Sequence, residues 1–147
     1  MTGAELTLRD ATNGDAAVVA ELLGELGYPA DPRDMPSRIE AVRREGGEVF
    51  VAVDATGEVL GLMCLSRHVA LHTPLPIGYI DALVTSGSAR RRGVGRFLVE
   101  QAKAWAKRSG CGRLTLTSAE HREAAHAFYP SCGMPYTGRR FATQIVP

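Results

Sequence analysis

A short glycine-rich segment, R-R-R-G-V-G at residues 90–95, lies between an apolar stretch and a helical pattern. The apolar stretch, residues 77–85, is typical of a strand, and the helical pattern continues to about Arg108. The first amides of a helix have no partner within it and point outward, where the macrodipole favours negative charge. Glycines let a ligand approach the backbone, and arginines pair with phosphate oxygens. The segment therefore predicts a strand–loop–helix unit that binds a pyrophosphate.

The spacing of this segment departs from two common nucleotide-binding motifs. A P-loop ends in Gly-Lys-Ser/Thr, whereas Arg96 and Phe97 follow here. A dinucleotide fingerprint needs a third glycine at position 98, which is Leu98. A glycine-rich turn before a helix can also serve the fold alone, so the motif by itself leaves the ligand open.

The composition indicates one soluble domain. A chain of 147 residues buries a sizeable core, and we expect a single domain over residues 1–147. The net charge of +1 indicates no general attraction to nucleic acid or to a membrane. No apolar stretch approaches the roughly 20 residues of a membrane span, and residues 1–10 lack the features of a signal peptide. We therefore expect a cytoplasmic location.

The cysteines and histidines do not form a ligand pattern. Cys64, Cys111 and Cys132 lack the C-x-x-C spacing, which favours plain thiols in a reducing compartment over a disulfide, a zinc site or a nucleophile. The four histidines are scattered along the chain, so we expect no metal.

The periodicity predicts a mixed α/β chain that opens with a hairpin sheet and lacks strict β–α–β alternation. Strands are expected at residues 6–9, 48–53, 59–65, 77–85 and 113–117, with one or two more between residues 136 and 146. Helices are expected from Thr12 or Asn13 to Leu26, then at residues 36–44, 94–109 and 123–129, with Pro130 truncating or kinking the last.

The order of these parts resembles the GCN5-related N-acetyltransferases, the GNAT superfamily. Their motif Gln/Arg-x-x-Gly-x-Gly/Ala is matched by Arg90, Gly93 and Gly95. A second block of the family, an aromatic residue or Leu, then Tyr, three residues and Gly-Phe, is matched by 128–134, with Met134 in place of the usual aromatic. The resemblance covers nearly the whole chain. It implies a twisted, mostly antiparallel sheet of six or seven strands with a splayed parallel pair, flanked by about four helices.

The resemblance also implies acetyl-coenzyme A (acetyl-CoA) as cosubstrate. Its pyrophosphate would lie on Arg90, Arg91, Arg92, Gly93, Val94, Gly95 and Arg96, and its pantetheine arm along Leu83, Val84 and Thr85. Arg122, where many relatives carry Asn, and His126, one turn before Tyr129, are further candidates for cofactor contacts.

Acetyl transfer from a thioester to an amine needs a neutral amine, a stabilised carbonyl oxygen and a protonated leaving thiolate. It needs no covalent enzyme intermediate, so we expect direct transfer in a ternary complex. Tyr129 matches the tyrosine that acts as general acid in many family members, and the alternative is a tyrosine that only packs.

Asp81 is a carboxylate within an apolar strand, and regular alternation places it on the face of Tyr79 and Leu83. It is our candidate to accept the amine's proton through water or to bind a cationic acceptor, and the alternative is a hydrogen-bonded strand residue. Glu120 and Glu123 are weaker rivals for the base.

We therefore expect an acetyl-CoA-dependent N-acetyltransferase that acts on a small-molecule amine or a peptide N-terminus. The acceptor site is expected at the loops of residues 27–36 and 68–76 and at the C-terminal strands, with a slight similarity to antibiotic-modifying enzymes. Neither nucleic acid nor a membrane is an expected partner, and a homodimer through C-terminal edge strands stays open. The rival readings are a non-catalytic acyl-CoA sensor on the same fold and a nucleotide-binding regulator.

Overall fold

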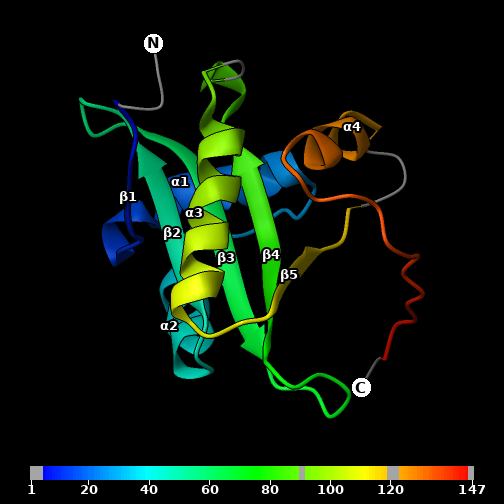
Figure 1. Ribbon diagram of the computed structural model, residues 1–147. Coiled ribbons are helices and arrows are strands. Elements are labelled where there is room, and N and C mark those ends of the chain that lie inside the picture. Colours follow the sequence, from blue (N-terminus) through cyan, green and yellow to red (C-terminus); the bar gives the residue numbers. More distant parts are fainter. Residues whose placement is uncertain (1–4, 90–91, 119–122, 146–147) are drawn as a thin grey trace. The chain divides into compact units, whose positions relative to one another are not determined.

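The computed structural model describes residues 5–89, 92–118 and 123–145 (Figure 1). The chain forms two compact units, residues 1–115 and residues 116–147, which are taken in turn below. Arg90, Arg91, Glu120 and Arg122, which the sequence singles out, lie outside the described residues.

A five-stranded sheet forms the centre of the first unit. Its strands stand in sequence order: β1 (Thr7–Asp10), β2 (Glu48–Val53), β3 (Val59–His68), β4 (Ile77–Thr85) and β5 (Arg113–Leu116). The first four pair antiparallel, and β5 returns parallel to β4 after a helical crossover. The mixed α/β prediction is confirmed, with fewer strands than expected.

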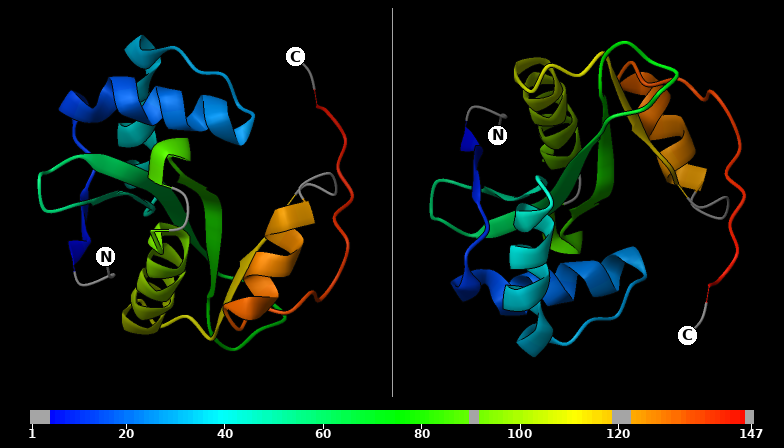
Figure 2. Two further views of the ribbon diagram at one scale, coloured as in Figure 1. Left: turned by 90° about the horizontal axis from the view of Figure 1, so that it is seen from above. Right: turned by 90° about the horizontal axis from the view of Figure 1, so that it is seen from below.

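Three helices cover the two faces of this sheet, α1 (Ala16–Leu26), α2 (Met35–Arg44) and α3 (Val94–Arg108). Helices α1 and α2 lie on one side of the strands and α3 on the other (Figure 2). On the α1 side, Leu62 and Val84 join one apolar cluster with Val19, Leu22 and Ile39. Because apolar side chains of the helices cover each face of the sheet, β2 is mostly buried and β3 is buried or half-buried up to Ser66.

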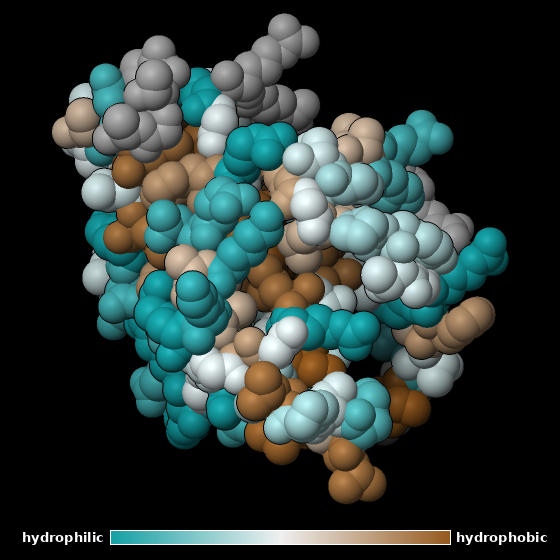
Figure 3. Space-filling model, viewed as in Figure 1, coloured by the Kyte–Doolittle hydropathy of each residue, from teal (hydrophilic) through white to brown (hydrophobic). Residues whose placement is uncertain are grey.

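Helix α3 has two different faces. Val94, Leu98 and Trp105 are buried, whereas hydrophilic side chains cover the outward face in Figure 3. Gly61 of β3 gives the helix room, since a Cβ there would stand 2.9 Å from Val94 and 3.0 Å from Leu98. The close approach of β3 therefore fixes where α3 begins.

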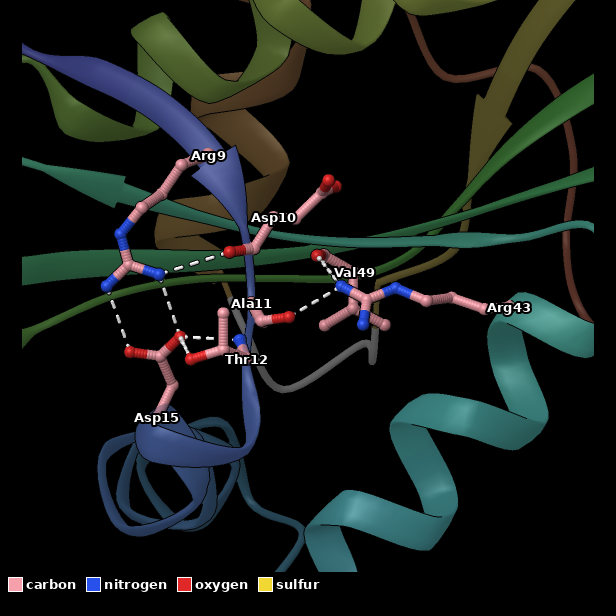
Figure 4. A network of polar contacts seen from close by, with 7 residues as sticks. All are labelled: Arg9, Asp10, Ala11, Thr12, Asp15, Arg43 and Val49. Atoms are coloured by element: carbon pink, nitrogen blue, oxygen red, sulfur yellow. Dashed lines mark hydrogen bonds and ion pairs between the residues drawn. The ribbon is translucent and has the colours of Figure 1, made fainter.

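A polar network joins β1 to the start of α1 (Figure 4). A short 3₁₀ turn, Asn13–Asp15, precedes the helix, with Thr12 as its cap. Asp15 accepts hydrogen bonds from the Thr12 amide at 2.7 Å and from the two terminal nitrogens of Arg9 at 2.8 and 3.0 Å. These charge-assisted bonds hold the pKa of Asp15 below its ordinary value. Thr12, one of the two predicted caps, thus caps the 3₁₀ turn, whereas the N-cap of α1 itself is Asp15.

Arg43 ties α2 to the same region (Figure 4). Its Nη2 donates to the carbonyl of Ala11 at 2.6 Å and to the carbonyl of Val49 at 3.2 Å. The guanidinium thus satisfies carbonyls at the end of β1 and in β2, where Ala11 itself donates to Val49 at 2.9 Å. This bridge holds α2 against the edge of the sheet.

The second unit contains one helix, α4 (Glu123–Ser131), within the part of the chain that the structure describes. The helix runs two residues beyond the expected end at Tyr129, because Pro130 lies in its last turn. A proline there removes only one amide, and the Phe128 carbonyl still accepts from the Ser131 hydroxyl at 2.6 Å and the Cys132 amide at 3.2 Å.

The strands expected between residues 136 and 146 are absent from the described residues, which extend to Ile145. Tyr136, Phe141 and Ile145 are largely exposed in this segment. Alternating apolar residues predict a strand only if a neighbouring strand supplies a hydrogen-bonded ladder, and none is assigned beside this segment. In the described part of the chain, no helix is both long and apolar enough to span a bilayer.

Candidate functional site

The chain passes from β4 to α3 through a tightly bonded connection. The Ser86 amide donates to the Leu60 carbonyl at 2.8 Å, and a short 3₁₀ turn follows at Gly87–Ala89. The Gly87 amide donates to Glu25 Oε1, on α1, at 2.9 Å. These bonds fix the position of residues 86 and 87, just after β4, against β3 and α1.

Gly93 is the residue that turns this connection into α3. It caps the helix in the left-handed conformation, with φ 77°, which strains any residue that carries a Cβ. Among the described residues, and apart from its two neighbours in the chain, no atom lies within 4 Å of where a Cβ of residue 93 would stand. The glycine is thus required by backbone conformation, and it leaves the helix start accessible.

The start of α3 presents positive charge. The amides of Val94 and Gly95 occupy the first two positions of the helix and have no carbonyl one turn earlier within it. Arg96 is exposed in the same turn, and Arg92 precedes it, half-buried. The side chain of Val94 packs inward, so only its amide is available to a ligand. This arrangement suits a phosphate group.

Arg92 has an acidic neighbour that the sequence did not reveal. Its Nη2 lies 3.9 Å from Oδ2 of Asp54, in the turn between β2 and β3. Asp54 Oδ1 accepts from the Thr56 hydroxyl at 2.6 Å, the Thr56 amide at 2.9 Å and the Glu58 amide at 3.1 Å. The Thr56 hydroxyl is the main cause that lowers the pKa of Asp54. The segment D-A-T-G predicted the turn but gave no sign of the arginine.

The last residues of β4 extend beyond the end of β5. The Gly112 amide donates to the Pro76 carbonyl at 2.9 Å, so β5 begins level with the start of β4. Only four residues long, β5 ends well before the end of a nine-residue parallel neighbour. Within the described residues, no strand is assigned beside β4 at 83–85 on that side. Backbone groups there can pair with the amides of a ligand.

Strand β4 is interrupted by a β-bulge at Asp81. Ile80 stands opposite Leu65 and Ala82 opposite Cys64, so Asp81 is the extra residue with no opposite partner. The side chain of Asp81 is exposed. A bulge takes backbone groups out of the ladder, so polar groups become available in the middle of the strand.

The bulge also corrects the predicted alternation. Tyr79 stands opposite Ser66 and Leu83 opposite Met63, and directly opposed residues share a face. Ser66 and Met63 are an odd number of residues apart on a strand, so Tyr79 and Leu83 point to opposite faces. The expectation that Asp81 shares a face with both is therefore wrong for Leu83, because the extra residue reverses the alternation.

Asp81 and Tyr79 line the same shallow, open hollow on the surface of β3 and β4. Its other lining residues are Ser66, Arg67 and His68. His68 and Tyr79 meet edge to face, with ring centroids 6.2 Å apart and an interplanar angle of 75°. The loop after His68 carries exposed apolar side chains, and brown atoms gather over it in Figure 3. A carboxylate beside two aromatic rings is a chemistry that suits an amine.

Cys64 stands opposite Ala82, next to the bulge at Asp81. Burial, and then the negative charge of Asp81, raise the pKa of its thiol to about 11. A thiol with a raised pKa is protonated at neutral pH, which fits the plain thiol that the sequence favoured over a nucleophile. Among the described residues, no group of three or more metal-ligating side chains comes together.

The second unit holds the tyrosine of the second motif. Tyr129 is half-buried in α4, and its ring meets that of Phe128 edge to face at 5.1 Å. Its carbonyl accepts from the amides of Cys132 at 3.0 Å and Met134 at 2.9 Å, while Gly133 adopts φ 82°. The glycine of the motif thus ends the helix in a left-handed cap. The acid role of Tyr129 stays a prediction.

The other candidates of this unit are solvent-facing. His126 and Glu123 are exposed on α4, with His126 one turn before Tyr129. Cofactor contacts of His126 and a base role for Glu123 also stay predictions.

Comparison with known proteins agrees with this geometry. The family model described as the acetyltransferase (GNAT) family matches residues 16–134, which is more than half of the chain. These features define an enzyme of the acyltransferase class. The chain belongs to the GNAT family of acetyltransferases, as its two motifs predicted.

Individual relatives extend the match. An aminoglycoside N(6')-acetyltransferase type 1 from Stenotrophomonas maltophilia is 31% identical over 137 residues, which cover 90% of this chain and 88% of the relative. The structure of a putative acetyltransferase from Agrobacterium tumefaciens shares 28% identity, with a TM-score of 0.79 over 96% of this chain and 99% of that one. Glucosamine-6-phosphate N-acetyltransferase from Arabidopsis thaliana has a TM-score of 0.81 at 21% identity and supports the fold alone, over 96% of this chain and 99% of that one.

Proposed function

We propose that this protein transfers an acetyl group from acetyl-CoA directly to the primary amine of a small molecule, within a ternary complex. The observation that supports the proposal is the left-handed turn at Gly93, after which the first amides of α3 can donate to an anion. The last residues of β4, which β5 does not reach, come shortly before this turn in the chain. Family membership supports the acetyl thioester as donor.

One orientation of acetyl-CoA would let it contact both the start of α3 and the last residues of β4. Its pyrophosphate would accept hydrogen bonds from the amides of Val94 and Gly95, with Arg92 and Arg96 adding charge. Arg90 and Arg91 belong to the same motif and join this proposal from the sequence. The pantetheine arm would then run back along residues 83–85, pairing with the strand's backbone. Its thioester would arrive at the bulge of Asp81.

The bulge supplies groups for the reaction. The amine nitrogen attacks the thioester carbonyl carbon, and the oxygen gains negative charge as the carbon becomes tetrahedral. A backbone amide at the bulge, where Asp81 has no opposite partner, would stabilise this oxygen. The Asp81 carboxylate would take the proton of the incoming ammonium, directly or through water.

Collapse of the tetrahedral intermediate breaks the carbon–sulfur bond. The leaving thiolate needs a proton, and we assign this role to Tyr129. An ordinary phenol has a pKa of about 10 and stays protonated at neutral pH, so it can donate. Support for this role comes from the residue type and its place in the second motif.

The acceptor class follows from the relatives and the hollow. The S. maltophilia relative is named for acetylating aminoglycosides, which are small amines. The exposed carboxylate of Asp81 beside aromatic rings favours a cationic small molecule over other acceptors. A peptide N-terminus is the second class to include in the assay.

Ligand-induced stabilisation tests the cofactor half of the proposal. Coenzyme A and acetyl-CoA should raise the melting temperature in proportion to their concentration, while ATP and NAD should not. Arg92→Ala should weaken the effect of coenzyme A, and Arg108→Ala, at the far end of α3, should leave it unchanged. Stabilisation by ATP or NAD alone would instead favour a nucleotide-binding regulator.

A further inference from the structure

We infer that the hollow on β3 and β4 receives the body of the acceptor, and that it takes a saturated, hydroxylated ring carrying the reactive amine. This inference rests on the proposed function and adds the substrate class and the residues that select it. Tyr79 and His68 are the specificity residues, and Asp81 marks the end of the hollow nearest the reaction.

Position is the first support. Residues 79 and 81 are two apart on β4, and both line the hollow. An amine that reacts beside Asp81 therefore places the atoms next to it over Tyr79.

The shape of the aromatic pair is the second support. Tyr79 is half-buried and His68 is exposed, and they meet at 75°. Two rings at this angle form a corner with a flat wall, against which the C–H face of a saturated ring can pack. A flexible chain would lose more rotational freedom when it binds to the same wall.

The polar lining is the third support. Ser66 offers a hydroxyl, His68 an imidazole and Asp81 a carboxylate to the same hollow. The remaining charged lining residue, Arg67, directs its Nε to the Ser109 carbonyl at 3.1 Å, at the end of α3. The polar groups that border the wall suit hydroxyl groups on the ring, and Asp81 suits its ammonium.

Three amines separate the parts of this inference. The first is a hydroxylated ring: methyl glucoside with an amine in place of the hydroxyl on its CH2OH group, called the aminodeoxy glucoside below. Cyclohexylmethylamine keeps the ring without hydroxyls, and n-heptylamine has the same number of carbons in an open chain. We expect kcat/KM to fall in that order for the wild-type protein.

The variants test the wall itself. Tyr79→Leu should lower kcat/KM for both ring amines by about fivefold to tenfold, the range for loss of one aromatic contact. The same variant should lower kcat/KM for n-heptylamine by less than for the ring amines, because an open chain packs less well against the wall, and it should leave the KM for acetyl-CoA unchanged. Tyr79→Phe is the matched control that keeps the ring, and it should behave as wild type towards cyclohexylmethylamine. His68→Ala should act in the same direction as Tyr79→Leu.

A binding measurement keeps this inference separate from the proposed function. Saturation-transfer NMR of the aminodeoxy glucoside, with coenzyme A present and no turnover, should show contact that Tyr79→Leu removes and Tyr79→Phe retains. Absence of turnover for every amine would contradict the proposed function, whereas this NMR result would still support the subsite. Equal loss for ring and open-chain amines in Tyr79→Leu, or no contact in wild type, would overturn the inference.

Discussion

At the scale of single residues, the geometry depends on two positions where the backbone departs from regular structure. Gly93 occupies the left-handed region at the start of α3, and Asp81 is the extra residue of a bulge in β4. Each departure makes backbone groups available at the place where the proposal needs them. Both residues therefore lend themselves to direct tests.

Gly93→Ala should weaken acetyl-CoA binding. The open space beside Gly93 accepts a methyl group, so the cost lies in the backbone conformation and should be about 1 kcal/mol. Calorimetric titration and denaturant unfolding measure the two effects. Gly24→Ala is the matched control, because Gly24 lies inside α1. Among the described residues, no atom outside the helix backbone lies within 4 Å of where its Cβ would stand, so alanine there should stabilise the fold. Unchanged cofactor affinity in Gly93→Ala would contradict the assigned site.

Asp81→Asn should lower kcat while leaving the KM for acetyl-CoA unchanged. The amide has nearly the shape of the carboxylate but cannot accept the amine's proton, and loss of a general base costs about a hundredfold or more. Steady-state kinetics with both substrates varied separate the two parameters. A normal kcat in the variant would remove Asp81 from the chemistry and leave it, at most, a binding role.

At the scale of elements, two junctions set the frame of the site. The first joins β1 to α1 through Arg9 and Asp15, and the second sets α3 against β3 at Gly61. Both are contacts within the first unit. Substitutions at these junctions should therefore change the free energy of unfolding. They should affect catalysis only if they move α3.

Asp15→Asn should lower the free energy of unfolding by about 1–2 kcal/mol at neutral pH, because the Arg9 bonds lose their charge. The folded-state pKa of Asp15 is depressed, so its stabilisation is present above the ordinary carboxyl pKa of about 4 and is lost as pH falls through the folded value. Wild type and variant should thus converge as the pH falls below the folded-state pKa of Asp15. Urea unfolding at several pH values measures this.

The matched control for that prediction is Asp31→Asn. Asp31 also pairs with an arginine, Arg33, but the pair is exposed and Asn caps the same turn equally well. The stability of this variant should stay much closer to that of wild type at every pH, because solvent screens the exposed pair even though Arg33 lowers the pKa of Asp31. A constant difference for Asp15→Asn from neutral to acid pH would show that charge is not the cause.

Gly61→Ala should both destabilise the fold and weaken cofactor binding. The added Cβ would meet side chains of Val94 and Leu98 at 2.9 and 3.0 Å and the Val84 carbonyl at 3.3 Å. Overpacking of this kind costs about 1–3 kcal/mol and should move the start of α3. Unfolding free energy and acetyl-CoA affinity are the measurements. A destabilised variant with normal affinity would separate the core contact from the site.

At the scale of the whole molecule, the family match spans residues 16–134 and so includes residues from both compact units. The expectation of one domain over residues 1–147 predicts a single cooperative transition. Fluorescence of Trp105 in α3 and far-ultraviolet circular dichroism should then unfold at the same denaturant concentration. Two separated transitions would contradict the one-domain prediction. A homodimer and a cytoplasmic location also stay predictions.

Much of the fold could be predicted from the sequence, because caps and breakers punctuate it clearly. Thr12 and Gly27 bound the first helical region, and Gly93 precedes α3 as its motif implied. Three features could not be predicted. The strand ending at His68 runs through polar residues, the bulge at Asp81 breaks an alternation rule that assumes regular pairing, and Asp54 meets Arg92 only through the tertiary fold. Each depends on contacts between distant segments, which local patterns do not encode.

One measurement tests the central claim most directly, namely mass analysis of an amine acceptor after incubation with acetyl-CoA, with thiol release followed in the same reaction. The aminodeoxy glucoside and a panel of aminoglycosides and peptides serve as acceptors, with Tyr129→Phe beside wild type. The proposed function predicts one acetyl group on the amine for each thiol released, at a rate that Tyr129→Phe lowers. Tight binding of acetyl-CoA with no acetylated product from any amine would contradict it.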